Sequence, residues 1–419
     1  MTDDSTPQTR QARLDRRPPH ATGQIRHPKF VYWRRRAVLV VSVLTLGYAL
    51  YLGTTLAFAL TNQSYGVSLS ARGAEWGREH GMGSIVTWVE QRYYSLNAPK
   101  KGGDPSKNDF GSGSPDVNIP REGHLPAPAT VSTPAKVAQA GEGVWHPVGR
   151  RTSAGIPAMY ESFIRPDAVH TSYVIGLVWM DPTLLEAQLY SGSFIPGGGP
   201  YKHSAPILPK TTGNLVAAFN AGFRMEDANG GYYTDGKTVL PLRKGGASVV
   251  IYNSGKLTVG EWGRDFKMTS DVREVRQNLD LIVDNAKPVA GLDSTNTLRW
   301  GKTLGGKFDV WRSGIGVTSN GAIIYAGGPA LTIGSLADVL IRAGAVRAME
   351  LDINTDWVQY STYRYATAGA ANGADGTSLL PNMVSSPARY FTTWFNRDFI
   401  VMQARPQDTA PTTTTTVTP

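Results

Sequence analysis

The sequence of 419 residues contains no cysteine, which excludes a disulfide framework and any thiol chemistry. Histidine is also scarce. Between residues 144 and 405 only His146, His170 and His203 occur, none of them in an HExxH or HxH arrangement, so a histidine-rich zinc site is not expected. The chain also lacks a G-x-S-x-G elbow and a Walker A sequence, which removes two common catalytic and phosphate-binding loops from consideration.

Positive charge is unevenly distributed along the chain. The formal net charge is +9, but residues 1–36 hold nine Lys and Arg against three Asp and Glu, which accounts for +6. Only +3 remains for the rest of the chain. A basic groove with interleaved aromatic residues is therefore not indicated, and we expect no nucleic acid partner.

Charge is absent from residues 37–60, an apolar run of 24 residues. At about 1.5 Å per residue a helix over this run reaches ~36 Å, enough to cross a hydrocarbon core of roughly 30 Å. Arg34, Arg35 and Arg36 directly precede the run, and Arg72 is the first charge after it. The positive-inside rule then predicts a single-pass protein in the lipid bilayer, with its N-terminus cytoplasmic and its C-terminal domain extracellular or periplasmic.

A cleaved signal peptide is the alternative, because Ala57-Phe58-Ala59 has the small-x-small form of a cleavage site. We favour an uncleaved signal anchor, since the leading segment is long and the apolar run exceeds the roughly 7 to 15 residues of a signal-peptide core. The expected segments are a basic cytoplasmic tail (1–36), the transmembrane anchor (37–60), a juxtamembrane helical stalk (61–96), a flexible Pro/Gly/Ser-rich linker (97–143), a folded domain (144–405) and a Thr/Pro-rich disordered tail (406–419).

The stalk is expected to lie on or near the membrane, because aromatic residues favour that interface and an amphipathic pattern is visible in it. Its apolar positions are Trp76, Ile85, Trp88, Val89 and Tyr93, although Gly81 and Gly83 weaken the helical pattern.

Strand signals dominate the folded domain. Apolar runs are separated by Asp235-Gly236, Asn253-Ser254-Gly255 and Asn320-Gly321, which are strong hairpin signals. One clear helix is expected to begin at Ser335 as its cap, with Asp338 completing a capping box and Gly344 ending it. This pattern predicts an α+β domain with a mixed, largely antiparallel sheet, hairpins and a few packed helices, preceded by the single transmembrane helix.

Polar residues gather at the ends of three predicted strands. Asn220 ends the strand 215–220 and enters a loop with Gly222, Gly230 and Gly231, where glycines would let the backbone approach a ligand. Arg312 begins a hairpin strand and offers a planar cation for phosphate. Glu350 and Asp352 share one face at a strand end, where two carboxylates can divide acid and base roles.

The same three segments resemble the phosphodiester glycosidase family, whose type activity removes N-acetylglucosamine from a sugar-1-phosphate diester and which includes bacterial proteins linked to exopolysaccharides. The resemblance rests on "AFNAGF", "RSGIGVTSNGAIIYA" and "SLADVLIRAGAVRAMELD", which follow the family order over about residues 210–360. The chain departs from the family where a Leu-Asp-Gly-Gly-Gly-Ser motif would stand, because it reads Leu351-Asp352-Ile353-Asn354-Thr355-Asp356.

The resemblance implies an envelope enzyme that cleaves the bond between an anomeric carbon and a phosphate oxygen. It assigns Arg312 to the phosphate, Asp352 to activating water or supporting the cationic sugar, and Glu350 to the role of a second carboxylate. Substrate contacts are expected from Asn220, Gly222, Gly230, Gly231 and Asn354, with a sugar-phosphate or envelope glycan as the partner.

Several alternatives remain open from the sequence. Arg312 and Glu350 can instead form a structural ion pair across the sheet, and Asn220 can be an ordinary turn former. A catalytically inactive relative that binds sugar-phosphate polymers or scaffolds envelope assembly is the other function. The sequence indicates no obligate cofactor and no defined set of metal ligands. A Ca²⁺ or Mg²⁺ ion bound by the side-chain oxygens of Asp352, Asn354 and Asp356 is the alternative. The oligomeric state does not follow from the sequence.

Overall fold

The computed structural model describes residues 29–111, 121–152, 155–208, 214–293, 297–301, 309–364, 372–392 and 397–406. The basic segment before residue 29 and the Thr/Pro-rich tail from residue 407 lie outside the described residues. The chain forms two compact units, residues 1–57 and 58–419.

The helix α1 (Lys29–Thr61) carries the apolar run and begins eight residues before the expected span of 37–60. Its apolar side chains are exposed along most of its length, and its length and composition suffice to cross a membrane. Among the described residues it is the one helix with these properties, which is consistent with a single-pass anchor or a signal sequence.

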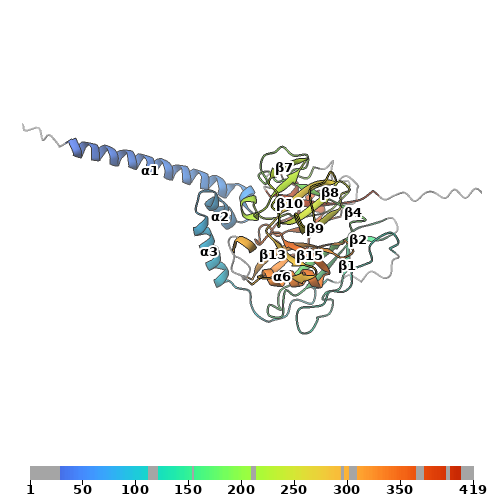
Figure 1. Ribbon diagram of the computed structural model, residues 1–419. Helices are drawn as coiled ribbons and strands as arrows, with labels where there is room; N and C mark the ends of the chain where they lie inside the picture. Colours follow the sequence, from blue (N-terminus) through green and yellow to red (C-terminus); the bar gives the residue numbers. More distant parts are fainter. Residues whose placement is uncertain are drawn as a thin grey trace, which may run out of the picture. The chain divides into compact units, whose positions relative to one another are not determined.

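The expected stalk consists of two helices rather than one. A short turn η1 (Gln63–Tyr65) leads into α2 (Leu69–Glu79), which Ser68 caps by accepting a hydrogen bond from the backbone of Ala71. The chain then reverses through Gly81, whose φ of +78° glycine adopts without strain, and continues as α3 (Gly83–Leu96). The two helices contact each other (Figure 1).

The largest sheet has the strand order β1-β2-β3-β14-β13-β15-β11-β12, and its neighbouring strands pair antiparallel. The helix α6 (Ile333–Arg342) packs on β11, β13, β14 and β15. The strands are β1 (His146–Arg151), β2 (Pro157–Ile164), β3 (Ile175–Met180), β11 (Leu281–Asp284), β12 (Lys287–Pro288), β13 (Val310–Thr318), β14 (Ile323–Leu331) and β15 (Ala345–Glu350).

Two five-stranded sheets complete the described domain, ordered β7-β6-β10-β8-β9 and β17-β16-β5-β18-β4. Their strands are β4 (Leu185–Tyr190), β5 (Leu215–Asn220), β6 (Tyr232–Thr234), β7 (Lys237–Leu240), β8 (Ala247–Tyr252), β9 (Leu257–Glu261), β10 (Val272–Gln277), β16 (Tyr360–Tyr363), β17 (Gly376–Ser378) and β18 (Phe399–Ala404). The short helices are α4 (Met225–Ala228), α5 (Thr297–Trp300), η3 (Gly373–Asp375) and η4 (Pro387–Phe391). The expected α+β class with antiparallel hairpins is confirmed.

All three hairpin turns lie where the sequence places them. Asp235-Gly236 joins β6 to β7, Asn253-Ser254-Gly255 joins β8 to β9, and Asn320-Gly321 joins β13 to β14. The expected cap of α6 is wrong by three residues. Thr332 is the cap and shares a capping box with Ser335, while Asp338 pairs with Arg342 at 2.6 Å. Ser and Thr are both common N-cap residues, so the local sequence did not show whether Thr332 or Ser335 is the cap.

The structure also differs from the flexible linker expected over 97–143. Phe110 and Val131 are buried at 1% and 2% exposure. Glu142 pairs with Arg165 at 2.7 Å, and Arg121 pairs with Asp181 at 2.8 Å. The described parts of this segment therefore pack on the domain. Its average composition resembles a tether, but buried apolar residues and ion pairs connect its described parts to the domain.

Candidate functional site

Ser313 joins the ends of two strands that the sequence singled out. Its Oγ accepts a hydrogen bond from the Asn220 side-chain amide at 3.0 Å and from the backbone N–H of Asp352 at 3.2 Å. The backbone of Ser313 also donates to the carbonyl of Asp352 at 2.8 Å. Asn220 ends β5, Ser313 lies in β13, and Asp352 follows β15. One buried hydroxyl thus fixes Asp352 relative to both sheets.

Asp352 lines a cavity of about 60 Å³, which we call the Asp352 pocket. The stalk helices supply one wall and the domain supplies the other. The lining residues are Glu75, Arg78, Glu90, Tyr94, Phe223, Arg224, Asp227, Gly301, Asp352, Ile353, Asn354, Trp357 and Arg397.

A carboxylate from α2 lies between two arginines in this pocket. Glu75 accepts hydrogen bonds from Arg224 at 3.1 Å and from Arg397 at 3.2 Å, and Nη1 of Arg78 lies 3.6 Å from the same carboxylate. Glu75 and Arg397 are 6% and 5% exposed. Guanidinium groups in this arrangement suit a carboxylate or a phosphate. The cluster is therefore an anion site that Glu75 occupies.

Stacking holds Arg397 in place. Its guanidinium carbon lies 4.5 Å from the ring centroid of Trp357, and that of Arg389 lies 4.4 Å from the same centroid. Arg389 also donates to the carbonyl of Asp356 at 2.7 Å. Two cations on one indole are attracted by its π-system, and the contact sets the direction of the Arg397 fork.

Asp352 has the electrostatics of a proton-transfer group. Its Oδ1 accepts hydrogen bonds from the backbone of Ile353 at 2.8 Å and of Asn354 at 3.2 Å. Burial raises the pKa of Asp352 to about 7, while the positive charge of Arg397 and the two backbone hydrogen bonds act in the opposite direction. A carboxyl group that titrates near neutrality can act as a general acid or base.

Arg312 and Glu350 form an ion pair inside the domain. Nη1 of Arg312 lies 2.6 Å from Oε1 of Glu350, and both side chains are fully buried. Burial raises the pKa of Glu350 to about 7, against the effect of Arg312. Neither residue lines the Asp352 pocket. The structural pairing left open by the sequence is confirmed, and these positions differ from the phosphate-binding and catalytic ones expected.

Strand geometry explains this difference. Neighbouring residues of a strand point to opposite faces, and in β13 it is Ser313 that faces Asp352 while Arg312 faces Glu350. Asn220 is similarly internal. Its Oδ1 accepts hydrogen bonds from the hydroxyl of Tyr325 at 3.0 Å and from the backbone of Gln359 at 3.1 Å, so it positions Asp352 through Ser313.

The three glycines expected at a ligand are close to protein atoms instead. A Cβ at Gly222 would lie 3.1 Å from the guanidinium carbon of Arg276. At Gly230 it would lie 2.5 Å from Cβ of Gln277, and at Gly231 it would lie 2.2 Å from the carbonyl oxygen of Pro241. Packing within the domain therefore accounts for glycine at these positions.

The row of oxygens after β15 serves the chain itself. The side-chain oxygen of Asn354 accepts from the backbone of Asp356 at 2.9 Å. Oδ1 of Asp356 accepts from the backbone of Val67 at 3.1 Å and of Ser68 at 3.0 Å, at the start of α2. Asn354 lines the Asp352 pocket, as a substrate contact requires. Backbone N–H groups thus bind one side-chain oxygen of each of Asp352, Asn354 and Asp356.

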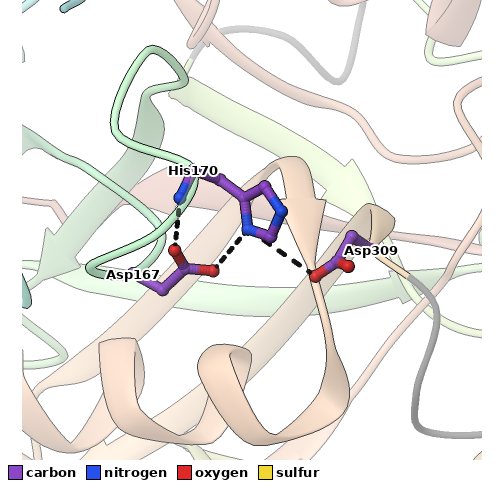
Figure 2. Close-up of side chains that lie close together, drawn as sticks. All are labelled: Asp167, His170 and Asp309. Atoms are coloured by element: carbon purple, nitrogen blue, oxygen red, sulfur yellow. Dashed lines mark hydrogen bonds and ion pairs between the residues drawn. The ribbon is translucent and has the colours of Figure 1, made fainter. Parts of the chain in front are cut away.

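A separate cluster combines Asp167, His170 and Asp309 (Figure 2). Nδ1 of His170 lies 2.8 Å from Oδ2 of Asp167 and 3.9 Å from Oδ1 of Asp309. Asp167 also accepts from the backbone of His170 at 2.6 Å. These are donor types that a divalent metal accepts, and local hydrogen bonds account for the positions of Asp167 and His170. The cluster does not line the Asp352 pocket.

Sequence reasoning missed four residues of the site. Ser313 lies within one of the quoted motifs and Arg224 directly follows another, so their position in these motifs could have identified them. Glu75 and Arg397 are 322 positions apart, and only the folded chain brings them together.

Part of the Asp352 pocket, including Arg224 and Asp352, comes from a segment that a family model recognises. The model of the phosphodiester glycosidase family matches residues 213–352, which run from the start of β5 to Asp352. The resemblance found in the motifs is thus confirmed for residues 213–352, which match the phosphodiester glycosidase family. No curated protein is significantly similar to the chain.

The solved structures that are similar to the chain at low identity include the following three. The catalytic domain of zebrafish N-acetylglucosamine-1-phosphodiester alpha-N-acetylglucosaminidase, auto-inhibited by its pro-peptide, is 14% identical, with coverage of 62% of this chain and 87% of that one and a TM-score of 0.40. A hypothetical protein from Synechocystis is 13% identical, with 59% and 62% coverage and a TM-score of 0.32. A putative exported protein from Burkholderia pseudomallei is 12% identical, with 55% and 74% coverage and a TM-score of 0.29.

Proposed function

We propose that this chain is a membrane-anchored extracytoplasmic hydrolase of glycosyl phosphodiester linkages in bacterial envelope or exopolysaccharide glycans. The observation that carries the proposal is the pocket that Asp352 shares with the buried Arg397 and the partly buried Arg224, in a chain that matches the phosphodiester glycosidase family. The pocket provides a proton-transfer group beside an anion site, which are the two elements that this reaction needs.

The chemistry follows from the charges in the pocket. Arg224 and Arg397 bind the phosphate diester, and Asp352 in its ionised form accepts a proton from the attacking water. Water adds to the anomeric carbon, the bond from that carbon to the phosphate oxygen breaks, and the products are a free sugar and a phosphate monoester. Because the leaving phosphate already carries negative charge, the arginines stabilise it and little protonation of the leaving oxygen is required.

Substrate entry requires Glu75 to leave the anion site. Its carboxylate holds both arginines, so a phosphate reaches them after these two contacts have broken. A change in the Glu75 side chain or a small shift of α2 would vacate the site. The proposed catalytic state is therefore one in which Glu75 no longer contacts Arg224 and Arg397.

The test is turnover by the full chain in detergent on a panel of glycosyl phosphodiesters, with and without divalent cations. We expect release of free sugar by the wild type and a loss of at least 100-fold in Asp352→Asn. The matched control is Asp338→Asn on α6, an exposed acid outside the pocket, which should keep wild-type activity. Full activity of Asp352→Asn would contradict the assignment.

A catalytically inactive, polymer-binding relative is the second candidate. It is favoured by the loop Ile353-Asn354-Thr355, which stands where active relatives are expected to carry glycines, and by the occupied anion site. Saturable binding of the phosphodiester panel with no turnover by wild type would select this function.

A further inference from the structure

A second and larger cavity lies between the stalk helices. Its volume is about 650 Å³, and its lining is mostly apolar, with hydrophobic side chains from both α2 and α3. We call it the stalk groove. Its large apolar side chains include Trp76, Met82, Ile85, Val86, Val89 and Tyr93.

The stalk groove continues into the Asp352 pocket. Glu90, Tyr94 and Asn354 line both cavities, so the two share a common wall of three residues. The two cavities differ in polarity. The Asp352 pocket contains the arginine cluster and Asp352, whereas the stalk groove is lined by hydrophobic side chains. A ligand that spans both cavities must therefore carry a negative charge next to an apolar chain.

The outer edge of the groove is unusually apolar for a surface. Ile85 and Val89 are 59% and 51% exposed and line the groove, and Tyr93 at 58% continues the same face at four-residue spacing. Exposed apolar patches of this kind mark binding surfaces. In the sequence this surface follows the apolar helix α1 closely, since only residues 62–68 separate α1 from α2.

We propose that the stalk groove binds the hydrocarbon chain of a lipid-linked glycosyl phosphodiester, whose phosphate lies at Arg224 and Arg397. This inference rests on the proposed function and names its substrate class. The arginines of the Asp352 pocket complement a phosphate, and the stalk groove complements an apolar chain. Because the two cavities share a wall, an amphiphile fits them better than a water-soluble glycan does. Transfer of a lipid from a bilayer into the groove also exchanges one apolar environment for another, so it needs no exposure of the chain to water.

The first test is the dependence of kcat/KM on chain length. Ethyl, butyl, hexyl and octyl esters of N-acetylglucosamine-1-phosphate and glucose-1-phosphate serve as soluble probes. Each buried methylene contributes about 0.8 kcal/mol, which corresponds to roughly fourfold in kcat/KM per carbon until the groove is filled. We expect kcat/KM of the full chain to rise steeply from ethyl to octyl. A flat series with measurable turnover would overturn the groove and leave the hydrolase standing.

Matched variants separate the groove from general membrane contact. Val89→Asp places a charge in the groove, whereas Trp88→Asp places one on the adjacent position of α3, which is 67% exposed and does not line it. We expect Val89→Asp to lower the octyl-to-ethyl ratio at least tenfold and Trp88→Asp to leave it unchanged. An equal loss in both variants would overturn the groove in favour of a membrane-contact role for the whole apolar row.

A binding measurement covers the case in which no ester turns over. Because the chain has no cysteine, Ser70→Cys introduces a single thiol in the groove for an environment-sensitive fluorophore. We expect a saturable blue shift with octyl phosphate and none with inorganic phosphate. Such a shift without turnover supports the groove and overturns the hydrolase. If neither a blue shift nor turnover is observed, the lipid-binding groove and the hydrolase are both overturned.

Discussion

Glu75 and Arg397 are 322 positions apart in the chain, and their side chains lie 3.2 Å apart in the Asp352 pocket. Arg224 holds the same carboxylate at 3.1 Å. A phosphate that binds there must replace Glu75, and charge-assisted hydrogen bonds of this kind contribute about 1.5–3 kcal/mol each. The internal carboxylate is thus a competitor for any anionic ligand.

The first prediction concerns this competition. Glu75→Gln keeps the shape of the side chain and removes its negative charge, so we expect kcat/KM for a phosphodiester to rise about tenfold, mainly through a lower KM. Steady-state kinetics of the full chain measure it. Glu79→Gln, on the same helix and outside the Asp352 pocket, is the control and should be neutral. A large drop in kcat for Glu75→Gln would instead give Glu75 a direct part in the reaction.

The second prediction is the pH profile of the reaction. Burial raises the pKa of Asp352 to about 7, and the proposed base must be ionised. We therefore expect kcat/KM to increase as pH rises from about 5 to 8, with a midpoint near pH 7. Initial rates across this range on one soluble ester measure it. Activity that decreases over the same range would mean that the protonated carboxyl is the active form.

The third prediction concerns stability. Because folding raises the pKa of Asp352 from 3.8 to about 7, the native chain binds this proton more tightly than the unfolded chain between those values. The free energy of unfolding from this group therefore falls as pH rises through about 4 to 7. Asp352→Asn removes the titration, and we expect it to gain up to about 4 kcal/mol over wild type between pH 4 and pH 8.

Urea unfolding of wild type and variant at several pH values checks this gain. Asp338→Asn again serves as control, since its carboxylate is exposed and pairs with Arg342 on the surface of α6. A stability difference between Asp352→Asn and wild type that does not change with pH would refute the predicted proton linkage.

The fourth prediction tests the role of the buried ion pair. Arg312→Met leaves Glu350 buried without its cation, which we expect to cost about 3–5 kcal/mol of unfolding free energy. The double variant Arg312→Met with Glu350→Leu removes both charges and should recover most of that loss. Denaturant unfolding measures both variants. If the double variant is as stable as wild type but inactive, the pair has a role in the reaction after all.

The sequence predicted most of the local structure in this fold. Asp235-Gly236 and Asn320-Gly321 give hairpins because few residues other than glycine accept the backbone angles that tight turns need. Asp352 could also be selected, since it ends a buried strand in a recognisable motif. Turn chemistry and strand alternation are local properties, and both are readable from a few neighbouring residues.

The composition of the site could not be predicted in the same way. Arg224, Arg397 and Glu75 come from three distant parts of the chain, and none has a local pattern that separates it from other charged residues. Arg312 was chosen for its chemistry, but the strand face that it occupies depends on register. The packing of Phe110 and Val131 was hidden in the same way by the average composition of their segment.

The contact of both Arg389 and Arg397 with the indole of Trp357 has a consequence for recognition. A flexible arginine loses rotamer freedom when it binds an anion, and that entropy loss weakens binding. Arg397 loses this freedom when the domain folds, because the stacked ring already fixes its direction. The pocket is therefore preorganised for a planar or tetrahedral anion, and its selectivity depends on the geometry of a rigid cation rather than on an adaptable one.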